Sequence, residues 1–285
     1  MIRVPNSSGT TRPRLPVPRD ACDCHLHIYD PRFAMPHPGR RATADATVAD
    51  YRLLQHRLGT TRAVVVQPAA YGTDNRVTVD AIEGIGRERA RGIAVATPDI
   101  TDAALAALHA AGIRGLRFSL HEPRAAATDA GMIEPLARRV AGLGWHVQVH
   151  LQAPQIVELA PILDRLPTPV VFDHLGRLHP GGLRDPAFGV VAGLLERGHA
   201  WVKLSGAYLN SALGGPAYAE CTEVAQAYVR LAPDRCVWGS DWPHPTEALA
   251  KPDDAALLDL LLDWAPAAAV RQRLLVDNPA ALYGF

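Results

Sequence analysis

The chain has 285 residues, of which 48% are hydrophobic and 20% are charged, a composition typical of a globular protein. Its 29 basic and 29 acidic side chains give a formal net charge of zero, and no basic run indicates a nucleic-acid partner. No stretch of about 18 apolar residues predicts a membrane span, and the N-terminus lacks the apolar segment of a secretory signal, so we expect a cytoplasmic protein.

Residues 1–20 contain four prolines among serines, threonines and arginines, and they show neither helical nor strand periodicity. Such a segment predicts an extended arm or a disordered tail. Apolar residues recur regularly from residue 21 onward, without a sign of an internal boundary. We therefore expect a proline-rich N-terminal arm over 1–20 and one folded domain over 21–285.

In this domain, short apolar runs alternate with segments of helical periodicity. The runs are short enough to be buried strands. They cover 22–28, 62–68, 91–97, 115–120, 146–152, 170–176, 200–206 and 236–242. The predicted helices cover 47–58, 76–89, 101–111, 129–143, 153–165, 186–197, 217–231 and 253–264, with an extra one at 266–275.

A strand followed by a helix, repeated eight times, is the pattern of a (β/α)8 TIM barrel in the α/β class. A doubly wound open sheet is the alternative, but that fold usually has a glycine-rich phosphate loop after its first strand. The first strand here is followed by Ile28-Tyr29-Asp30-Pro31, which is no such loop. The sequence therefore predicts a single-domain barrel, whose active site lies at the carboxyl ends of the strands.

The first predicted strand carries two histidines. Side chains at positions i and i+2 of a strand point to the same face, so His25 and His27 can converge on one point. Later strands end in polar side chains, namely Gln67, Arg117, His150, His174, Lys203, Asp241 and His244. So many polar groups in one apolar interior are costly and are tolerated chiefly at functional sites.

These residues resemble the pattern of the amidohydrolase superfamily, which has an H-x-H pair on strand 1, histidines on strands 5 and 6 and an aspartate on strand 8. The stretches 172–177, 202–208 and 238–245 resemble its lactonase branch, which acts on 2-pyrone-4,6-dicarboxylate, muconolactones and sugar-acid lactones. The resemblance covers residues 20–285. It implies a carboxylic-ester hydrolase that opens a small anionic or polyhydroxylated lactone.

Lactone hydrolysis needs a base for the attacking water and a positive partner for the carbonyl oxygen. Asp241 is the candidate base, and the resemblance gives the same role to the aspartate of strand 8. His25, His27 and His174 are the candidates to polarise the carbonyl, either directly as N–H donors or through a bound divalent ion.

The sequence leaves the metal content open between a zinc site and a metal-independent site, and no organic cofactor is expected. If a metal is bound, its expected ligands are His25, His27, His150, His174 and Asp241. The lactonases that the chain resembles are metal-independent, whereas the wider superfamily is metal-dependent. His150 stands where the pyrone-hydrolysing branch has a tyrosine, and it completes the ligand set of the superfamily.

Substrate binding is expected to involve arginines, which pair bidentately with carboxylates, and side chains that can bond hydroxyl groups. The predicted substrate-binding residues are Arg117, Arg124, Arg177, Tyr71, Asn75, His150, Tyr208 and His244. The loop at 206–210 lacks the arginine of the pyrone-hydrolysing relatives and resembles sugar-lactone members. A carboxylated pyrone, a muconolactone and a sugar-acid lactone are therefore all candidate substrates.

Three other functions are open on the same fold. A lactone isomerase of the galactarolactone type carries asparagine at the position of Asp241, so the aspartate favours hydrolysis. A metal-dependent decarboxylase would need a tightly held zinc ion, and a non-catalytic binding barrel would have no use for a base aimed at water. The expected partner is a small-molecule lactone, without nucleic acid or membrane, and a homo-oligomer is left open.

Overall fold

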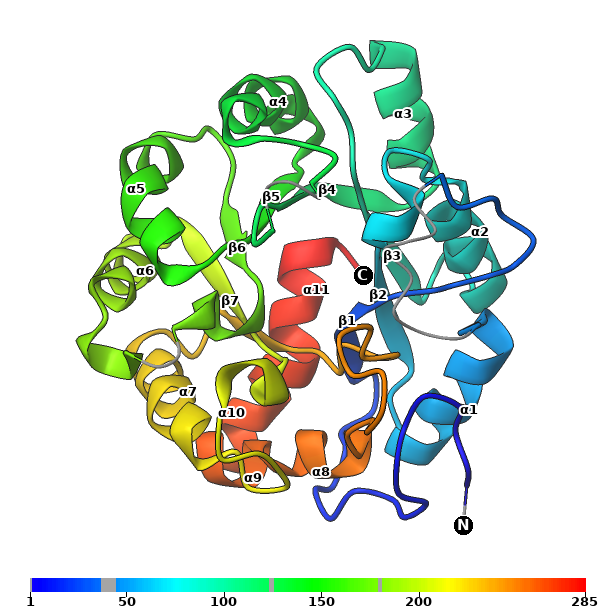
Figure 1. Ribbon diagram of the computed structural model, residues 1–285, viewed down its shortest axis with the longest axis vertical. Helices are drawn as coiled ribbons and strands as arrows, with labels where there is room; N and C mark the ends of the chain where they lie inside the picture. Colours follow the sequence, from blue (N-terminus) through cyan, green and yellow to red (C-terminus); the bar gives the residue numbers. More distant parts are fainter. Residues whose placement is uncertain (1, 37–44, 123–125, 179–180) are drawn as a thin grey trace.

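The computed structural model describes residues 2–36, 45–122, 126–178 and 181–285. Eight parallel strands follow one another around a barrel in the order β1 to β8 (Figure 1). They are Cys22–Leu26 (β1), Arg62–Val66 (β2), Ala90–Ala94 (β3), Ile113–Ser119 (β4), His146–His150 (β5), Val170–Phe172 (β6), Ala200–Leu204 (β7) and Cys236–Trp238 (β8). The predicted (β/α)8 barrel is confirmed, and the open doubly wound alternative is wrong.

Helices form the outer ring of the barrel and cover its apolar face (Figure 1). They are Val48–Leu58 (α1), Arg76–Ile85 (α2), Asp102–Ala110 (α3), Ile133–Val140 (α4), Ala153–Asp164 (α5), Pro186–Glu196 (α6), Ala219–Leu231 (α7), Asp254–Asp259 (α8), Leu261–Trp264 (α9) and Ala268–Gln272 (α10). The last helix, Asn278–Tyr283 (α11), lies inside this ring in Figure 1, and its Tyr283 packs in one buried cluster with residues of the strands. The helix predicted at 253–264 is split into α8 and α9. The chain also continues past α10 into α11, a helix that the sequence analysis did not predict; its Pro279 lies in the first turn, where proline is tolerated.

Two of the predicted strands end earlier than expected. β6 ends at Phe172 rather than at 176, and β8 ends at Trp238 rather than at 242. Left-handed backbone follows both strands, with φ values of 52° at His174 and 63° at Asp241. A strand cannot include this conformation. These two predicted catalytic residues therefore lie in loops directly after the strands.

The first strand and the segment after β8 form the seam of the barrel. The His27 backbone N–H donates to the Trp242 carbonyl at 2.8 Å, and the Asp241 N–H donates to the His25 carbonyl at 2.8 Å. Gly239 lies so close to β1 that an added Cβ would be 2.6 Å from the Cβ of His25. The seam thus fixes the position of residues 239–242 relative to the two histidines of β1.

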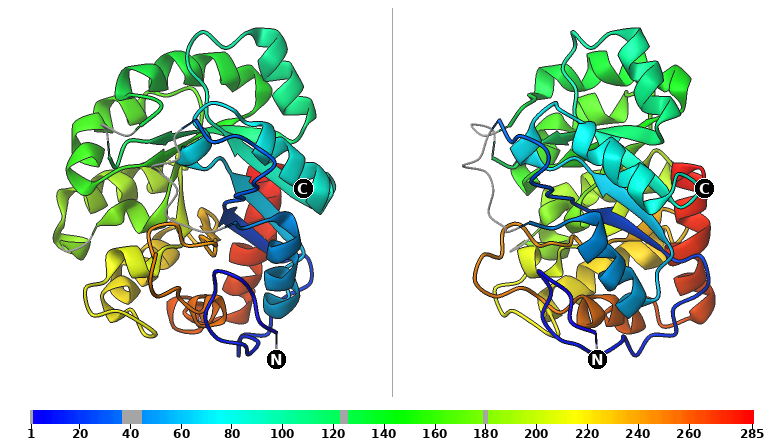
Figure 2. Two further views of the ribbon diagram at one scale, coloured as in Figure 1. Left: turned by 45° about the vertical axis from the view of Figure 1, so that its right-hand side comes forward. Right: turned by 90° about the vertical axis from the view of Figure 1, so that its right-hand side faces the viewer.

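The N-terminal residues 2–20 contain no helix or strand, and they run along the barrel beside α1 and α8 (Figure 2). Val4 and Leu15 are buried in the hydrophobic core. The Leu15 N–H donates to Asp259 at 2.9 Å, and the buried Arg57 donates to the Gly9 carbonyl at 2.8 Å. None of the helices in the described part of the chain has the length and hydropathy that crossing a membrane requires.

Replacing Gly239 by alanine is expected to lower the free energy of unfolding by about 1–3 kcal/mol, because the new methyl group would force β1 and β8 apart. Urea denaturation of both proteins measures the change. The matched control is Gly142→Ala, since nothing lies within 4 Å of a Cβ added at that position. Equal stability of the two variants would show that the seam tolerates a side chain.

Candidate active site

A cavity of about 630 Å³ opens at the carboxyl ends of the strands. Its lining includes six of the polar residues that the sequence places on or at the ends of the strands. These are His27, Gln67, Arg117, His150, His174 and Asp241. The candidate site therefore lies where the barrel pattern predicts it.

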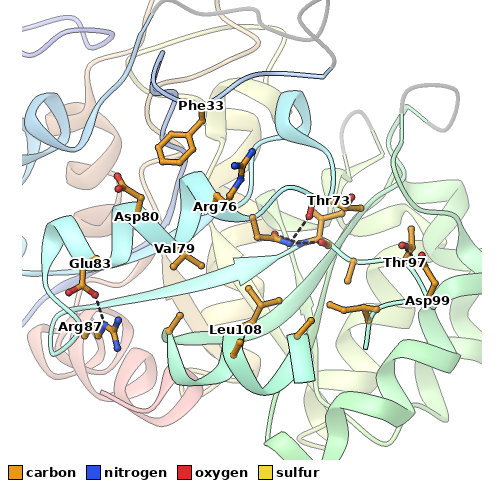
Figure 3. A pocket seen from close by; sticks show the side chains of 17 residues that line it. Phe33, Thr73, Arg76, Val79, Asp80, Glu83, Arg87, Thr97, Asp99 and Leu108 are labelled. Carbon is orange, nitrogen blue, oxygen red and sulfur yellow. Dashed lines mark hydrogen bonds and ion pairs between the residues drawn. The ribbon is translucent and has the colours of Figure 1, made fainter. Parts of the chain in front are cut away.

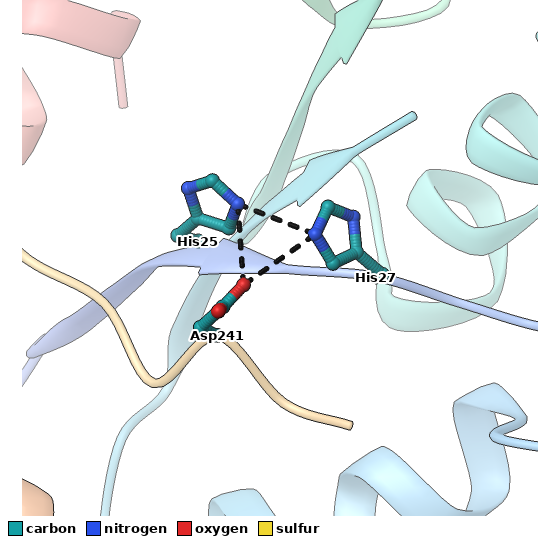
Figure 4. A group of neighbouring side chains, drawn as sticks. All are labelled: His25, His27 and Asp241. Carbon is teal, nitrogen blue, oxygen red and sulfur yellow. Dashed lines mark hydrogen bonds and ion pairs between the residues drawn. The ribbon is translucent and has the colours of Figure 1, made fainter. Parts of the chain in front are cut away.

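Three side chains from the two sides of the seam converge at one point beside this cavity (Figure 4). His25 Nε2 and His27 Nε2 are 3.3 Å apart. Each of these nitrogens lies 3.5 Å from Asp241 Oδ1. His174 is the next imidazole, with its Nε2 at 3.9 Å from Asp241 Oδ2. The convergence of His25 and His27 expected from their i, i+2 spacing is thus present in the structure.

Asp241 is surrounded by groups that favour its charged form. Burial alone would raise the pKa of this carboxyl group, but the neighbouring His174, His27 and His25 hold it well below its ordinary value. The Tyr208 hydroxyl also donates to Asp241 Oδ2 at 2.6 Å. Burial lowers the pKa of His174 to about 4 and that of His25 well below its ordinary value. At neutral pH Asp241 is therefore expected to be a carboxylate, with neutral rings at His174 and His25.

The other ring nitrogen of each histidine is held by a partner. His27 Nδ1 lies 2.8 Å from the Val66 carbonyl oxygen, which can only accept, so the proton of the neutral ring is on Nδ1. In that tautomer Nε2 is the nitrogen that could ligate a metal ion. His25 Nδ1 lies 3.2 Å from Asp173 Oδ1, and His174 Nδ1 lies 3.0 Å from the Ser205 hydroxyl. Such partners are typical of histidines that act as metal ligands.

The donor atoms fit a divalent ion. Ligands about 2.1 Å from zinc in tetrahedral geometry are about 3.4 Å from one another. The three separations among His25 Nε2, His27 Nε2 and Asp241 Oδ1 are 3.3, 3.5 and 3.5 Å. A second group of potential ligands comprises His25, Asp173 and His174. Neither group includes His150, which the sequence analysis had placed among the expected ligands.

A buried ionic network lies beneath this cluster. Asp173 Oδ2 accepts from Arg117 Nε at 3.0 Å and from Gln148 Nε2 at 3.2 Å. Lys203 Nζ donates to Gln148 Oε1 at 2.7 Å and lies 3.3 Å from His25 Nδ1. Burial opposes the ionised form of Asp173, but His25, Arg117 and Lys203 together hold its pKa well below the ordinary value. The network thus joins the Arg117 guanidinium to His25.

Sequence reasoning missed Asp173 and Gln148 as parts of the site. A signal for each was present, since Gln148 is two residues before His150 on the same strand and Asp173 directly precedes His174. The sequence analysis also gave no role to Ser119 and His121, which line the cavity. The His121 ring stacks on that of His150, with centroids 4.9 Å apart.

The predicted substrate-binding residues fall into separate places. Arg117 and His150 line the cavity, and His150 Nδ1 lies 3.2 Å from the Ser119 hydroxyl. Arg177 is not on the lining of the cavity, but its Nη2 lies 3.4 Å from Nε2 of His121, which is. Arg124 is outside the described residues.

The other four predicted substrate-binding side chains contact the protein itself. Tyr71 donates its hydroxyl to the Asp30 carbonyl at 3.0 Å, and Asn75 bonds to both backbone groups of Val95. Tyr208 and His244 lie beside Asp241 and do not line the cavity.

A second cavity, of about 800 Å³, lies outside the barrel between α2 and α3 (Figure 3). Its charged side chains pair with each other or with neighbours, as Arg87 does with Glu83. None of the described side chains around it has a buried polar atom that lacks a partner. This cavity offers no converging reactive groups, so the candidate active site is the one at the strand ends.

Comparison with known proteins identifies relatives that cover almost the whole chain. A family model described as amidohydrolase matches residues 22–285. The chain is 37% identical over 287 residues to a 2-pyrone-4,6-dicarboxylate hydrolase from Comamonas testosteroni, with 97% of this chain and 94% of that protein covered. It is 35% identical to a 4-sulfomuconolactone hydrolase from Rhizobium radiobacter, with 94% and 91% covered. It is also 33% identical to a D-galactarolactone isomerase from Agrobacterium fabrum, with 97% and 94% covered.

Two solved structures share the fold closely. A crystal structure of an Agrobacterium tumefaciens protein in its apo form has a TM-score of 0.89 and 32% identity, with 98% of each chain covered. A probable 2-pyrone-4,6-dicarboxylic acid hydrolase from Acinetobacter baumannii, solved with citric acid bound, has a TM-score of 0.78 and 28% identity, with 93% of this chain and all of that chain covered.

Replacing Asp173 by asparagine is expected to lower the free energy of unfolding by about 3 kcal/mol or more, because Arg117 and Lys203 would lose the buried negative charge that they face. Urea denaturation measures the change. Asp164→Asn is the matched control, since Asp164 pairs with Arg197 at the exposed surface and its loss should change little. A similar small effect of both substitutions would mean that the network does not depend on the charge of Asp173.

Proposed function

The chain belongs to the amidohydrolase family, and we propose that it is a lactone hydrolase in which Asp241 activates the attacking water. The observation that carries the proposal is the position of this carboxylate, 3.5 Å from the Nε2 atoms of both His25 and His27 and on the lining of a 630 Å³ cavity. The hydrolase names of the relatives at 37% and 35% identity support the same reaction.

In the proposed reaction, a water molecule attacks the lactone carbonyl and gives a proton to Asp241 Oδ1. The negative charge that develops on the carbonyl oxygen needs a nearby donor. His174 can supply it from Nε2 when the Ser205 hydroxyl donates to Nδ1. The C–O bond of the ring then breaks, and the proton held by Asp241 passes to the departing ring oxygen. The product is an open-chain hydroxy acid.

His25, His27 and Asp241 would hold a divalent ion, for which their donor atoms have the required spacing. A bound zinc ion would polarise the carbonyl oxygen and lower the pKa of a coordinated water. The network of Asp173 and Lys203 would keep His25 oriented in either case, since both contact its Nδ1.

The substrate that the cavity favours is a small lactone with an anionic group. Arg117 places a guanidinium on the lining of the cavity, and the hydrogen bond from its Nε to Asp173 fixes the orientation of that group. The citric acid bound by the relative from Acinetobacter baumannii supports a site for carboxylates. Tyr71, Asn75 and Tyr208, expected to bond sugar hydroxyls, are engaged with the protein instead.

The second candidate function is lactone isomerisation, because one relative at 33% identity is a D-galactarolactone isomerase. Both reactions begin with attack of an oxygen nucleophile on the same carbonyl, so the fold cannot separate them. A pH-indicator assay on a panel of aromatic-pathway and sugar-acid lactones does separate them, since hydrolysis releases acid and isomerisation does not. Acid release supports the proposal. Ring rearrangement seen by NMR without acid release would replace it with the isomerase.

Asp241→Asn is expected to lower kcat for lactone hydrolysis by about 10²–10⁴-fold, because the amide cannot take the proton from water. The thermal unfolding temperature should stay within a few degrees of the wild type, since the two side chains have the same shape. Steady-state kinetics and differential scanning fluorimetry measure the two effects. Turnover close to that of the wild type would refute the role of Asp241 as the base.

The chelator-treated protein is expected to bind one equivalent of zinc, because three buried donor atoms have the spacing of zinc ligands. Isothermal titration calorimetry measures the binding. His27→Ala should abolish it, and His150→Ala is the matched control that should retain it. Loss of binding in the His150 variant would restore His150 as a ligand. The assay on metal-free enzyme, with and without added zinc, then shows whether turnover requires the ion.

A further inference from the structure

The carboxylate of Asp241 is held from the side opposite its two histidine neighbours on β1. Its Oδ1 faces His25 and His27, whereas its Oδ2 accepts a 2.6 Å hydrogen bond from the Tyr208 hydroxyl. Tyr208 lies in the short 3-10 helix Ala207–Asn210 after β7 and is not among the residues that line the cavity. The Tyr208 hydroxyl therefore donates its hydrogen bond to the Asp241 carboxylate and not to a ligand in the cavity.

His244 is the next contact along this chain of groups. It is fully buried, and its Nδ1 lies 3.2 Å from the Tyr208 hydroxyl oxygen. Because a tyrosine has one proton and Tyr208 gives it to Asp241, the His244 contact requires an N–H at Nδ1 that donates to the tyrosine oxygen. The rings meet edge to face, with centroids 5.2 Å apart. His244 thus holds Tyr208 in the orientation that serves Asp241.

The chain of groups ends at a buried carboxylate. His244 Nε2 lies 3.2 Å from Asp254 Oδ1 without a hydrogen bond between the two atoms, and neither side chain is accessible to solvent. The other oxygen of Asp254 accepts from the Ser7 hydroxyl, and the buried Arg57 lies 3.8 Å away. Ser7 belongs to the N-terminal arm, so the arm contacts the buried carboxylate that neighbours His244.

The backbone adds a further constraint at two members of this chain. Asp241 and His244 have φ values of 63° and 56°, in the left-handed region that non-glycine residues seldom adopt. Such conformations persist where the surroundings fix them, and they cluster at functional sites. Here the His244 N–H donates to the Asp241 carbonyl at 2.8 Å, which closes the turn between them.

From these contacts we propose that Tyr208 and His244 are positioning residues, which hold the Asp241 carboxylate through a buried relay that runs from Asp241 to Tyr208 and His244. The inference rests on the proposed role of Asp241 in lactone hydrolysis and gives Tyr208 and His244 a function other than the substrate binding expected from the sequence. Because the Tyr208 hydroxyl donates to Oδ2, Oδ1 is the oxygen left to accept the proton from water.

Tyr208→Phe tests this inference, because it removes the hydroxyl and leaves the ring. Loss of a partner that orients a reacting or ligating group is expected to cost about 10- to 100-fold. We expect kcat to fall by that factor, with KM within about twofold of the wild type. The matched control is Tyr228→Phe, since the buried Tyr228 hydroxyl has no hydrogen-bond partner among the described residues and its loss should leave both constants unchanged.

A pair of substitutions at His244 extends the test. His244→Leu should reproduce the fall in kcat, whereas His244→Asn should recover most of it, because the asparagine amide can donate from the place of Nδ1. Zinc affinity, measured by calorimetry, supplies a second readout that needs no substrate. Tyr208→Phe should weaken zinc binding by about 10- to 100-fold, with Tyr228→Phe again unchanged.

The outcomes are distinct. A higher KM with unchanged kcat and unchanged zinc affinity would overturn the inference and make Tyr208 a substrate contact. Equal loss in His244→Leu and His244→Asn would overturn the role of the Nδ1 donor. If the wild type releases acid from no lactone, the proposed function fails, and the zinc affinities of the same variants still decide whether the relay positions Asp241.

Discussion

The site depends on the hydrogen-bonded seam between β1 and the segment that follows β8. Two backbone bonds, from His27 to Trp242 and from Asp241 to His25, set the register of these segments. A shift of one residue would turn every side chain of β1 to the opposite face of the sheet. Because the register is fixed, the carboxylate of Asp241 lies 3.5 Å from both imidazoles of β1, although Asp241 follows His27 by 214 positions in the sequence.

The seam alone would leave an unfavourable arrangement, since buried polar groups are stable only when they are paired. In the barrel interior each buried charged group has an oppositely charged or polar neighbour. Asp173 faces the cations Arg117 and Lys203, and Lys203 in turn lies against His25. The same network that neutralises buried charge therefore also orients a candidate catalytic imidazole. The same residues therefore stabilise the barrel and set the geometry of the site, which explains why Lys203 is fully buried there.

The barrel and the convergence of the two β1 histidines could be predicted because both depend on local sequence patterns. Apolar runs predict strands, and the i, i+2 spacing of His25 and His27 predicts their convergence. The roles of Tyr208 and His244 could not be predicted in this way. Both follow strands whose ends turn sharply, and the left-handed backbone at His244 determines where its ring points. Asp173 was missed because its partners come from four other strands, and sequence spacing holds no information on how those strands are staggered.

A reacting carboxylate must meet two opposed requirements. It has to be desolvated and close to the reaction centre, yet it has to keep one oxygen in a single orientation. A carboxylate held at only one oxygen could rotate about its Cβ–Cγ bond. In this chain the two oxygens face different surroundings, imidazole nitrogens at Oδ1 and a tyrosine hydroxyl at Oδ2. The asymmetry of these partners distinguishes the two oxygens of Asp241, and the partner at Oδ2 is supplied by a loop that lies outside the eightfold pattern of the barrel.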